Sequence, residues 1–289
     1  MPTSTAEISK LRELTGAGMM DCKKALDEAE GNMEKASEIL RKKGIIKAAK
    51  REGKIAAEGL TAVKVAGNAA AIIEINSETD FVAKSDDFVN LVNLVADTVV
   101  AEKPVTVEAA LALPALANKF SEAVAKIGEK ISLRRLALVE KGAGENIGAY
   151  VHMGGKISAI TVLVGGSEEL ARDISMHIAA SNPRYLNRES VDPAEVAKEK
   201  EIAGEQLRAQ KKPENIIENI VKGKLDKFYG EICLLEQPYI KDEEKTVGKL
   251  AEEAGAKIKA FYRYELGEGM EKKSCDFAAE VAEQLHPVK

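Results

Sequence analysis

The order of the expected strands and helices after residue 55 repeats once, and this repetition constrains the fold more than any other feature. Residues 60–75 predict two strands joined at Gly67-Asn68, and two helices and a closing strand at 130–139 follow. The same order of hairpin, helix, helix and strand returns between Tyr150 and Leu266. Residue identity between the two segments is weak, so a duplication is inferred from the element order alone. It predicts an α+β protein whose core has two similar halves, each an antiparallel sheet with helices on one face.

Apolar side chains at helical spacing locate the helices of this core, which we divide into halves at 55–140 and 141–267. In the second half the expected helices are 168–180 and 247–253. In the first half, two helices carry apolar faces made of Phe88, Leu91, Val92, Val95 and Val99, and of Leu116, Phe120, Val124 and Ile127.

Residues 1–54 predict a separate module, a small three-helix bundle of the UBA-like kind. Ser4 and Glu7 have the spacing of a capping box, which begins the first helix. We expect the third helix to stop at Gly44, because glycine commonly ends helices. The inward faces of the three helices are expected to be Ile8, Leu11 and Leu14; Cys22, Ala25, Leu26 and Ala29; and Ala36, Ile39 and Leu40.

The segment that joins this module to the core is strongly basic. From Arg41 to Lys54 there are seven basic residues and one acidic residue. This pattern predicts either a solvated linker helix or a basic face that docks on an acidic partner.

An insertion interrupts the second half. Asp192-Pro193 is a typical helix start, and Lys212-Pro213 predicts a turn between two helices. We expect an antiparallel helical hairpin, a coiled coil at 188–228, that projects from the body; a packed bundle element is the alternative. The C-terminal module, 268–289, is expected to contain an amphipathic helix at 274–285.

Composition excludes several classes of protein. The 42 basic and 47 acidic residues give a net charge of −5, which disfavours nucleic-acid binding over the whole surface. No apolar run approaches the ~18–20 residues that a transmembrane helix needs, and no secretory signal is visible at the N-terminus. The three cysteines lie far apart without a C-x-x-C pair, so we expect neither a disulfide scaffold nor a zinc knuckle, and a reducing cytosol as the compartment.

Motifs of catalysis and of nucleotide binding are missing from the sequence. The three histidines are scattered, and the segment before Gly155-Lys156 has Tyr150 where a phosphate loop needs glycine. Gly142, Gly144 and Gly148 are spaced one residue too widely for a dinucleotide fingerprint. We therefore expect no catalytic residues, no metal site and no cofactor, although an enzyme built from scattered carboxylates stays open as an alternative.

Two other motifs stand out, and both allow two interpretations. In TGAGMMDCKKAL (15–26), Met19 and Met20 belong either to the core or to an adaptable apolar contact surface. In NSETDFVAK (76–84), Thr79 or Asp80 can cap a helix while Phe81 packs in the core. Alternatively, Phe81 and Asp80 form an exposed pair that anchors in a partner.

Both motifs resemble the signatures of the bacterial translation elongation factor Ts family. The resemblance continues through KIGEKISLRR (126–135), YVHMGGKI (150–157) and DFAAEVA (276–282). It implies a cytoplasmic, non-enzymatic guanine nucleotide exchange factor for elongation factor Tu, in which the Mg²⁺ and the GDP or GTP belong to the partner. It also implies the modules described above, and a complex that is either a heterodimer or a two-plus-two assembly. The other class of function left open is a module that captures a peptide or a ubiquitin-like partner.

The resemblance also implies roles for individual residues. The segment of Thr79, Asp80, Phe81 and Val82 would enter the partner's GTPase domain, and Phe81 would fill an apolar cleft there, which displaces groups that hold Mg²⁺. Four positions differ from residues frequent in the family, namely Ser77, Lys156, Ser158 and Lys241. Further partner contacts are implied for Met19, Met20, Lys23, Ile127, Gly128, His152 and Ile240.

Overall fold

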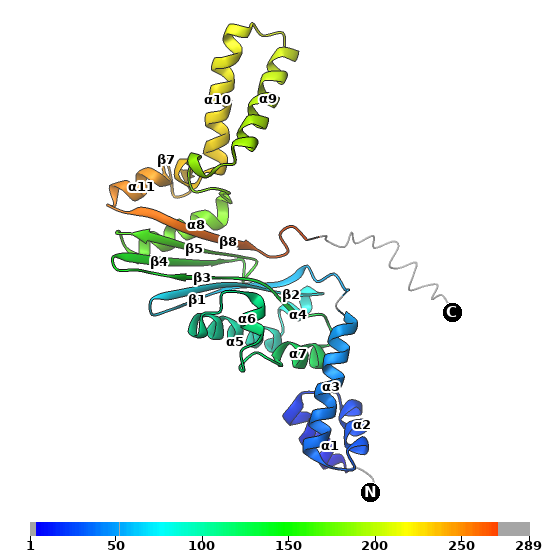
Figure 1. The fold of residues 1–289 in the computed structure, drawn as a ribbon. Helices are drawn as coiled ribbons and strands as arrows, with labels where there is room; N and C mark the ends of the chain where they lie inside the picture. Colours follow the sequence, from blue (N-terminus) through cyan, green and yellow to red (C-terminus); the bar gives the residue numbers. More distant parts are fainter. Residues whose placement is uncertain (1–3, 52, 271–289) are drawn as a thin grey trace.

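The computed structural model describes residues 4–51 and 53–270, so the predicted helix at 274–285 lies outside the described residues. Three parts follow one another in Figure 1: a bundle of three helices, a core of two sheets with helices outside them, and a helical hairpin that extends away from the sheets. The fold class is mixed, with helices and small antiparallel sheets, as the sequence predicted. None of the described helices is long and apolar enough to cross a membrane.

The N-terminal bundle consists of α1 (Thr5–Thr15), α2 (Met19–Glu28) and α3 (Met33–Arg51). The predicted capping box of Ser4 and Glu7 is present. Leu14 is 71% exposed, so its expected place in the core was wrong. A strict spacing of three residues drifts by about 60° per step around a helix of 3.6 residues per turn, which turns Leu14 out of the face. The bundle core contains Ile8, Leu11, Cys22, Ala25, Leu26, Ala29, Ala36 and Leu40.

The expected end of the third helix at Gly44 was also wrong, because α3 continues to Arg51. Gly44 is buried against α7 (Lys119–Ile127), where an added Cβ would lie 3.1 Å from the Ala125 Cβ and 3.3 Å from the Ser121 carbonyl oxygen. Glycine here permits a close approach of two helices. Helix α3 therefore reaches from the bundle into the core.

The core contains two three-stranded antiparallel sheets with the same order. The first has β1 (Glu58–Ala66), β2 (Ala69–Ser77) and β3 (Ser132–Glu140), in the order β1-β2-β3. The second has β4 (Glu145–His152), β5 (Ile157–Val164) and β8 (Lys257–Glu265), in the order β4-β5-β8.

The two sheets also share an irregularity. In each, the register with the closing strand shifts after the sixth residue of the central strand, at Glu74 in β2 and at Val162 in β5. The extra residues on the closing strands are Arg134 and Lys259. A bulge at the same place in both halves agrees with the duplication inferred from the element order.

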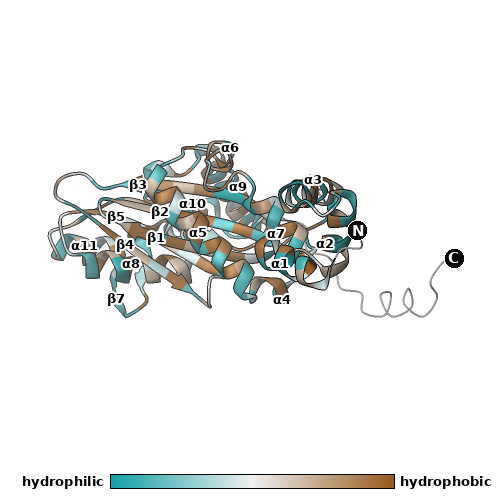
Figure 2. Ribbon diagram, turned by 90° about the horizontal axis from the view of Figure 1, so that it is seen from below, coloured by the Kyte–Doolittle hydropathy of each residue, from teal (hydrophilic) through white to brown (hydrophobic). Residues whose placement is uncertain are grey.

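Each sheet is covered by helices on its outer side, and the inner sides of the two sheets pack against each other (Figure 1). Helices α5 (Asp86–Glu102), α6 (Val107–Leu111) and α7 cover the first sheet. Helices α8 (Glu168–Ser181) and α11 (Val247–Glu253) cover the second. The strands of the core are mostly brown in Figure 2, whereas much of α3 is teal. Helices α5, α7, α8 and α11 lie where the sequence placed them.

Strand β2 is buried on both faces along its whole length. Its odd-numbered residues from Ala69 to Ile75 pack against the helices, while Ala70 and Ile72 pack against the other sheet. Successive side chains of β2 therefore point into two separate hydrophobic cores.

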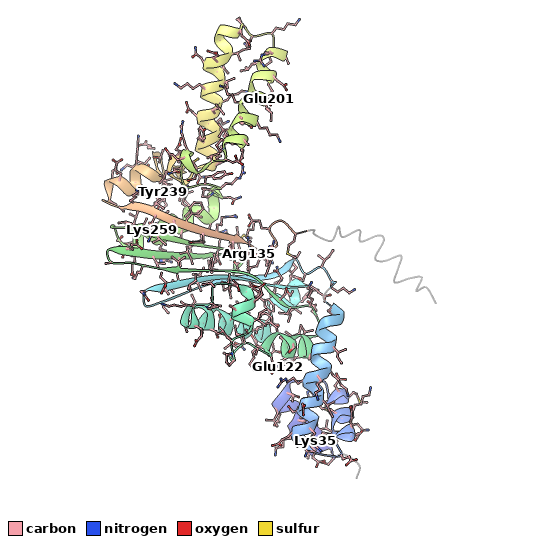
Figure 3. The ribbon with its side chains drawn as sticks, viewed as in Figure 1. Lys35, Glu122, Arg135, Glu201, Tyr239 and Lys259 are labelled. Atoms are coloured by element: carbon pink, nitrogen blue, oxygen red, sulfur yellow. The ribbon has the colours of Figure 1, made fainter. Side chains whose placement is uncertain are left out.

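A buried carboxylate closes one end of the contact between the sheets. Glu74 Oε2 accepts from Arg135 Nε at 2.6 Å, and Glu74 Oε1 accepts from Arg134 Nη1 at 3.0 Å and from the Gly267 N–H at 2.9 Å. The bulge in β3 brings both guanidinium groups opposite one carboxylate. Arg135 also donates to the Glu265 carbonyl of β8, and Figure 3 shows it between the two sheets. Burial by itself raises the pKa of Glu74, but the Gly267 N–H and the two arginines outweigh it and hold that pKa below its ordinary value.

The insertion forms α9 (Pro193–Ala209) and α10 (Glu214–Ile232), preceded by the short helix η1 (Arg188–Ser190) and followed by η2 (Leu234–Glu236). Asp192 caps α9 as predicted. Helix α10 continues beyond residue 228 because its last turn packs Ile232 and Phe228 against Val191. A small hairpin of β6 (Pro238–Tyr239) and β7 (Asp242–Thr246) follows, which the sequence did not predict.

We expect Glu74→Gln to lower the free energy of unfolding by about 3 kcal/mol at neutral pH, because the half-buried Arg134 and Arg135 both lose their buried counter-charge. The stabilisation by the Glu74 carboxylate is complete above its ordinary pKa of 4.5 and disappears as the pH falls through the lowered pKa of the folded protein. The difference between the variant and the unmodified protein, measured by urea denaturation, should therefore shrink as the pH is lowered below 4.5.

The matched control is Glu268→Gln, which removes the exposed carboxylate 3.1 Å from Arg135. This change should cost less than about 0.5 kcal/mol. Equal losses for the two variants would contradict the role given to Glu74.

Candidate functional site

The ETDFVAK motif lies where the most buried strand ends. Strand β2 ends at Ser77, and the one-turn helix α4 (Asp80–Ala83) begins three residues later. Of the two predicted caps, Thr79 is the one observed, since its Oγ1 accepts from the Val82 N–H at 3.4 Å.

The Phe81 side chain points away from the protein. It is 81% exposed, whereas Phe88, seven residues later, is fully buried. On the same turn, Val82 and Ala83 pack against the first core. The interpretation of Phe81 as a core residue is therefore wrong, and the exposed aromatic of the alternative is what the structure contains.

Two loops hold the motif by exchanging hydrogen bonds. The Glu129 carboxylate accepts from the Thr79 N–H at 3.0 Å and from the Thr79 hydroxyl at 2.8 Å. In return, the Glu78 carboxylate accepts from the Lys130 N–H at 2.7 Å and from Arg51 at 2.7 Å. Burial raises the pKa of Glu78, but the Lys130 N–H and Arg51 outweigh it, so that pKa lies below its ordinary value.

The Asp80 carboxylate lies beside the exposed ring and is ionised at neutral pH. It accepts from Lys84 Nζ at 2.6 Å, one turn further along the chain. This hydrogen bond lowers the pKa of Asp80. An aromatic ring and a negative charge are therefore presented together on α4.

Helix α4 forms a ridge between two surface grooves. The first groove lies between α4 and the N-terminal bundle and is lined by Arg12, Gly16–Gly18, Lys126, Ile127 and Glu129. The second groove lies on the side of the β4–β5 turn and is lined by Glu58–Leu60, Met153, Gly154 and Lys156.

The TGAGMM motif borders the first groove. Gly16 ends α1 with a left-handed backbone, and an added Cβ would lie 2.9 Å from the Lys126 Cδ of α7. Met19 and Met20 are exposed at the start of α2, which favours the contact-surface interpretation over the core. Lys23 is exposed on the same helix.

The other two predicted residues near this groove belong to the end of α7. Ile127 is half-buried against the first core, and Gly128 ends the helix with φ of 86°. An added Cβ at Gly128 would meet no atom of the described residues within 4 Å.

His152 and an unpredicted methionine lie at the β4–β5 turn, beside the second groove. His152 is half-exposed and stacks on Tyr150 with ring centroids 6.0 Å apart. Met153 is 71% exposed with φ of 49°. The sequence signal for it was a methionine directly before Gly154-Gly155, at the tip of the predicted hairpin.

All four positions that differ from residues frequent in the resembled family have partners within the chain. Ser158 is buried with its Oγ 2.8 Å from the Thr61 Oγ1, across the contact between the sheets. Lys156 pairs with Glu58 at 2.8 Å, and Lys241 pairs with Asp173 at 2.7 Å. Ser77 is buried and donates to the Thr79 carbonyl at 3.0 Å, next to the motif.

Ile240 lies apart from the other predicted contact residues. It is partly exposed at the tip of the β6–β7 hairpin, which lies away from α4 in both Figure 1 and Figure 2. Figure 3 labels the preceding residue, Tyr239. The Ile240 N–H donates to Nδ1 of buried His177 at 3.3 Å, and burial lowers the pKa of that histidine. The predicted site therefore divides into a large surface around α4 and a smaller one at Ile240.

Within residues 4–51 and 53–270, no group of three or more His, Cys, Asp or Glu side chains could hold a metal ion. Cys22 and Cys233 are buried free thiols, and Cys275 lies outside the described residues. Whether the chain carries a cofactor stays a prediction from the sequence.

Comparisons with known proteins agree on one family. The family profile described as "Elongation factor TS" matches residues 78–268, beginning at the first residue of ETDFVAK. Elongation factor Ts of Pediococcus pentosaceus is 50% identical over 283 residues, which cover 96% of this chain and 97% of that protein. The chain belongs to the elongation factor Ts family. Elongation factor Ts of Limosilactobacillus fermentum is 48% identical over 287 residues, with 98% of both chains covered.

Gly155 ties the β4–β5 turn to the first sheet, and we expect Gly155→Ala to be far more costly than Gly154→Ala. The Gly155 carbonyl accepts from the Thr61 N–H at 2.7 Å. An added Cβ there would lie 2.9 Å from the Thr61 carbonyl oxygen, on a backbone with φ of 98°. The loss of unfolding free energy should be about 3 kcal/mol.

Gly154 is the matched control, because its φ is also positive but an added Cβ would meet none of the described atoms within 4 Å. Gly154→Ala should cost about 1 kcal/mol. Chemical denaturation of both variants measures the difference, and equal losses would show that the contact with Thr61 does not constrain the turn.

Proposed function

We propose that this chain is a guanine nucleotide exchange factor for elongation factor Tu in translation, acting in the bacterial cytoplasm without an active site of its own. It binds the GDP-bound partner, promotes release of GDP and stabilises the nucleotide-free state. One observation supports this proposal above the others: in a chain of the elongation factor Ts family, the aromatic ring of ETDFVAK stands exposed on a ridge whose base is held by hydrogen bonds.

The action is mechanical and electrostatic. The ring of Phe81 enters an apolar cleft of the partner's GTPase domain with Asp80 beside it, while Thr79 and Val82 form the base of the same turn. Moving the partner's helices displaces the groups that hold Mg²⁺, and loss of the cation removes much of the charge that retains the diphosphate. The factor does not need to touch the nucleotide, which is consistent with a sequence that lacks a phosphate loop.

Energetics require more contacts than the ring provides. By linkage, the factor weakens nucleotide binding by the same coupling energy with which nucleotide weakens binding of the factor. A shift of about 10⁴ in nucleotide affinity needs about 5.5 kcal/mol of differential binding. Burying one phenylalanine contributes about 1.5–3 kcal/mol.

A wide second contact must therefore contribute the rest of this energy. Its candidates are the exposed residues around the two grooves and the separate tip at Ile240. They are Met19, Met20, Lys23, Ile127, Gly128, His152 and Ile240. The complex is a heterodimer or a two-plus-two assembly, without direct contact to nucleic acid or membrane.

We expect Phe81→Ala to lower the rate of GDP release from elongation factor Tu by at least about tenfold, or about 1.4 kcal/mol of transition-state stabilisation. Stopped-flow release of fluorescently labelled GDP measures this rate. Because Phe81 is 81% exposed, the same change should alter the free energy of unfolding by less than about 0.5 kcal/mol.

Phe88→Ala is the contrasting variant, since its ring is fully buried. It should cost about 3–5 kcal/mol of stability. An unchanged release rate for a folded Phe81→Ala protein would refute the role of the ring.

A further inference from the structure

The direction of the Phe81 ring is set by a very short connection. Only Glu78 and Thr79 lie between the end of β2 and the start of α4. A helix of four residues has too few internal hydrogen bonds to be stable by itself. The orientation of α4 must therefore come from groups outside it.

Thr79 makes the contacts that orient α4, because its N–H and its hydroxyl both donate to the carboxylate of Glu129. Glu129 Oε2 accepts from the Thr79 N–H and Glu129 Oε1 from the Thr79 hydroxyl. Because the hydroxyl proton points to Glu129, a lone pair on the same oxygen is free to accept from the Val82 N–H at 3.4 Å. Hydrogen bonds to an ionised acceptor are stronger than neutral ones, so Glu129 fixes both the backbone and the cap of α4.

Glu129 is itself well placed for this task. It follows Gly128, whose left-handed backbone ends α7, and it precedes Lys130, whose N–H is bound by Glu78. The loop at 128–130 and the loop at 78–79 therefore hold each other, Glu129 by its bonds to Thr79 and Glu78 by its bond to Lys130.

We propose that Glu129 is the positioning residue of the exchange reaction: it preforms α4 in the free protein so that Phe81 is presented to the partner at no ordering cost. This inference rests on the proposed function, in which Phe81 enters the partner. Glu129 acts through Thr79, and ordering of α4 before association leaves more of the binding energy of the ring for the nucleotide-free complex.

The first test needs no partner. The chain contains no tryptophan, so Phe81→Trp introduces one tryptophan at the tip of α4, which can be excited at wavelengths that the six tyrosines do not absorb. We expect Glu129→Gln, added to this background, to lower the fluorescence anisotropy of the tryptophan. Glu122→Gln is the matched control, because it removes the same charge from an exposed residue of α7 that pairs with Lys119 (Figure 3). Equal anisotropy in the two double variants would overturn the proposal.

The second test is a double-mutant cycle on GDP release. Glu129→Gln alone should lower the release rate about tenfold, which corresponds to about 1.4 kcal/mol, while Glu122→Gln should not change it. In the Phe81→Ala background, Glu129→Gln should change the rate by less than about twofold, because the side chain that it positions is gone. If Glu129→Gln lowers the release rate by the same factor with and without the Phe81 ring, Glu129 acts independently of the ring, and the proposal is overturned.

Thr79 provides a second set of variants if Glu129→Gln impairs folding, which thermal melting monitors. Thr79→Val keeps the shape without the hydroxyl and should lower the release rate as Glu129→Gln does, well below the rate of Thr79→Ser, which keeps the hydroxyl. Equal rates for these two variants would also overturn the proposal. If Phe81→Ala leaves GDP release unchanged, the proposed function of the ring fails, and the anisotropy test still decides whether Glu129 orders α4.

Discussion

The burial of β2 on both faces is the constraint on which the rest of the structure depends. One set of alternate residues belongs to the helix-covered core and the other to the contact between the sheets. A slip of one residue would exchange the two sets and would place Glu74 among aliphatic side chains without its arginines. The register of this strand is therefore fixed by two cores and one ion-pair cluster. Because the ETDFVAK motif follows directly after β2, the register also fixes where the motif leaves the protein.

This arrangement explains how a very exposed ring can have a defined position. Short surface segments usually have low local stability, since few buried contacts oppose their opening. Here the turn that carries Phe81 has Val82 and Ala83 packed on the first core, and its first residue is held by Glu129. The exposed part is limited to the ring and the neighbouring carboxylate, while the backbone beneath them is tied to the most buried strand of the core.

Most of the fold could be predicted from the sequence because its signals are local. Helical spacing, the capping box at Ser4 and the Gly67-Asn68 turn act within a few residues, and these elements formed where expected. The predicted helix end at Gly44 was wrong because the local sequence does not distinguish a glycine that ends a helix from one that lets a neighbouring helix approach. The neighbour that explains this glycine, Ala125, is distant in the sequence.

The residues that support the site were missed for a similar reason. Glu74 meets Arg134 and Arg135 across a bulge that no local pattern reveals. Glu129 reaches Thr79 from fifty residues away in the chain. The exposure of Phe81 was also undecided from local sequence, since a capping threonine followed by an aromatic suits a buried staple equally well.

The separation of Ile240 from α4 gives the contact between the sheets a functional meaning within the proposed mechanism. Helix α4 belongs to the first half of the core and the β6–β7 hairpin packs on the second. If the partner is held at both places, the strain that opens its nucleotide site is transmitted through the packing of Ile72 and Ile160 and through Glu74. If the contact between the halves were soft, the halves would move instead of the partner's helices, because parts that carry the same force deform most where they are most compliant. The contact between the two halves is closely packed, with buried aliphatic side chains and a buried ion pair. A contact of this kind resists deformation and can therefore transmit the strain to the partner.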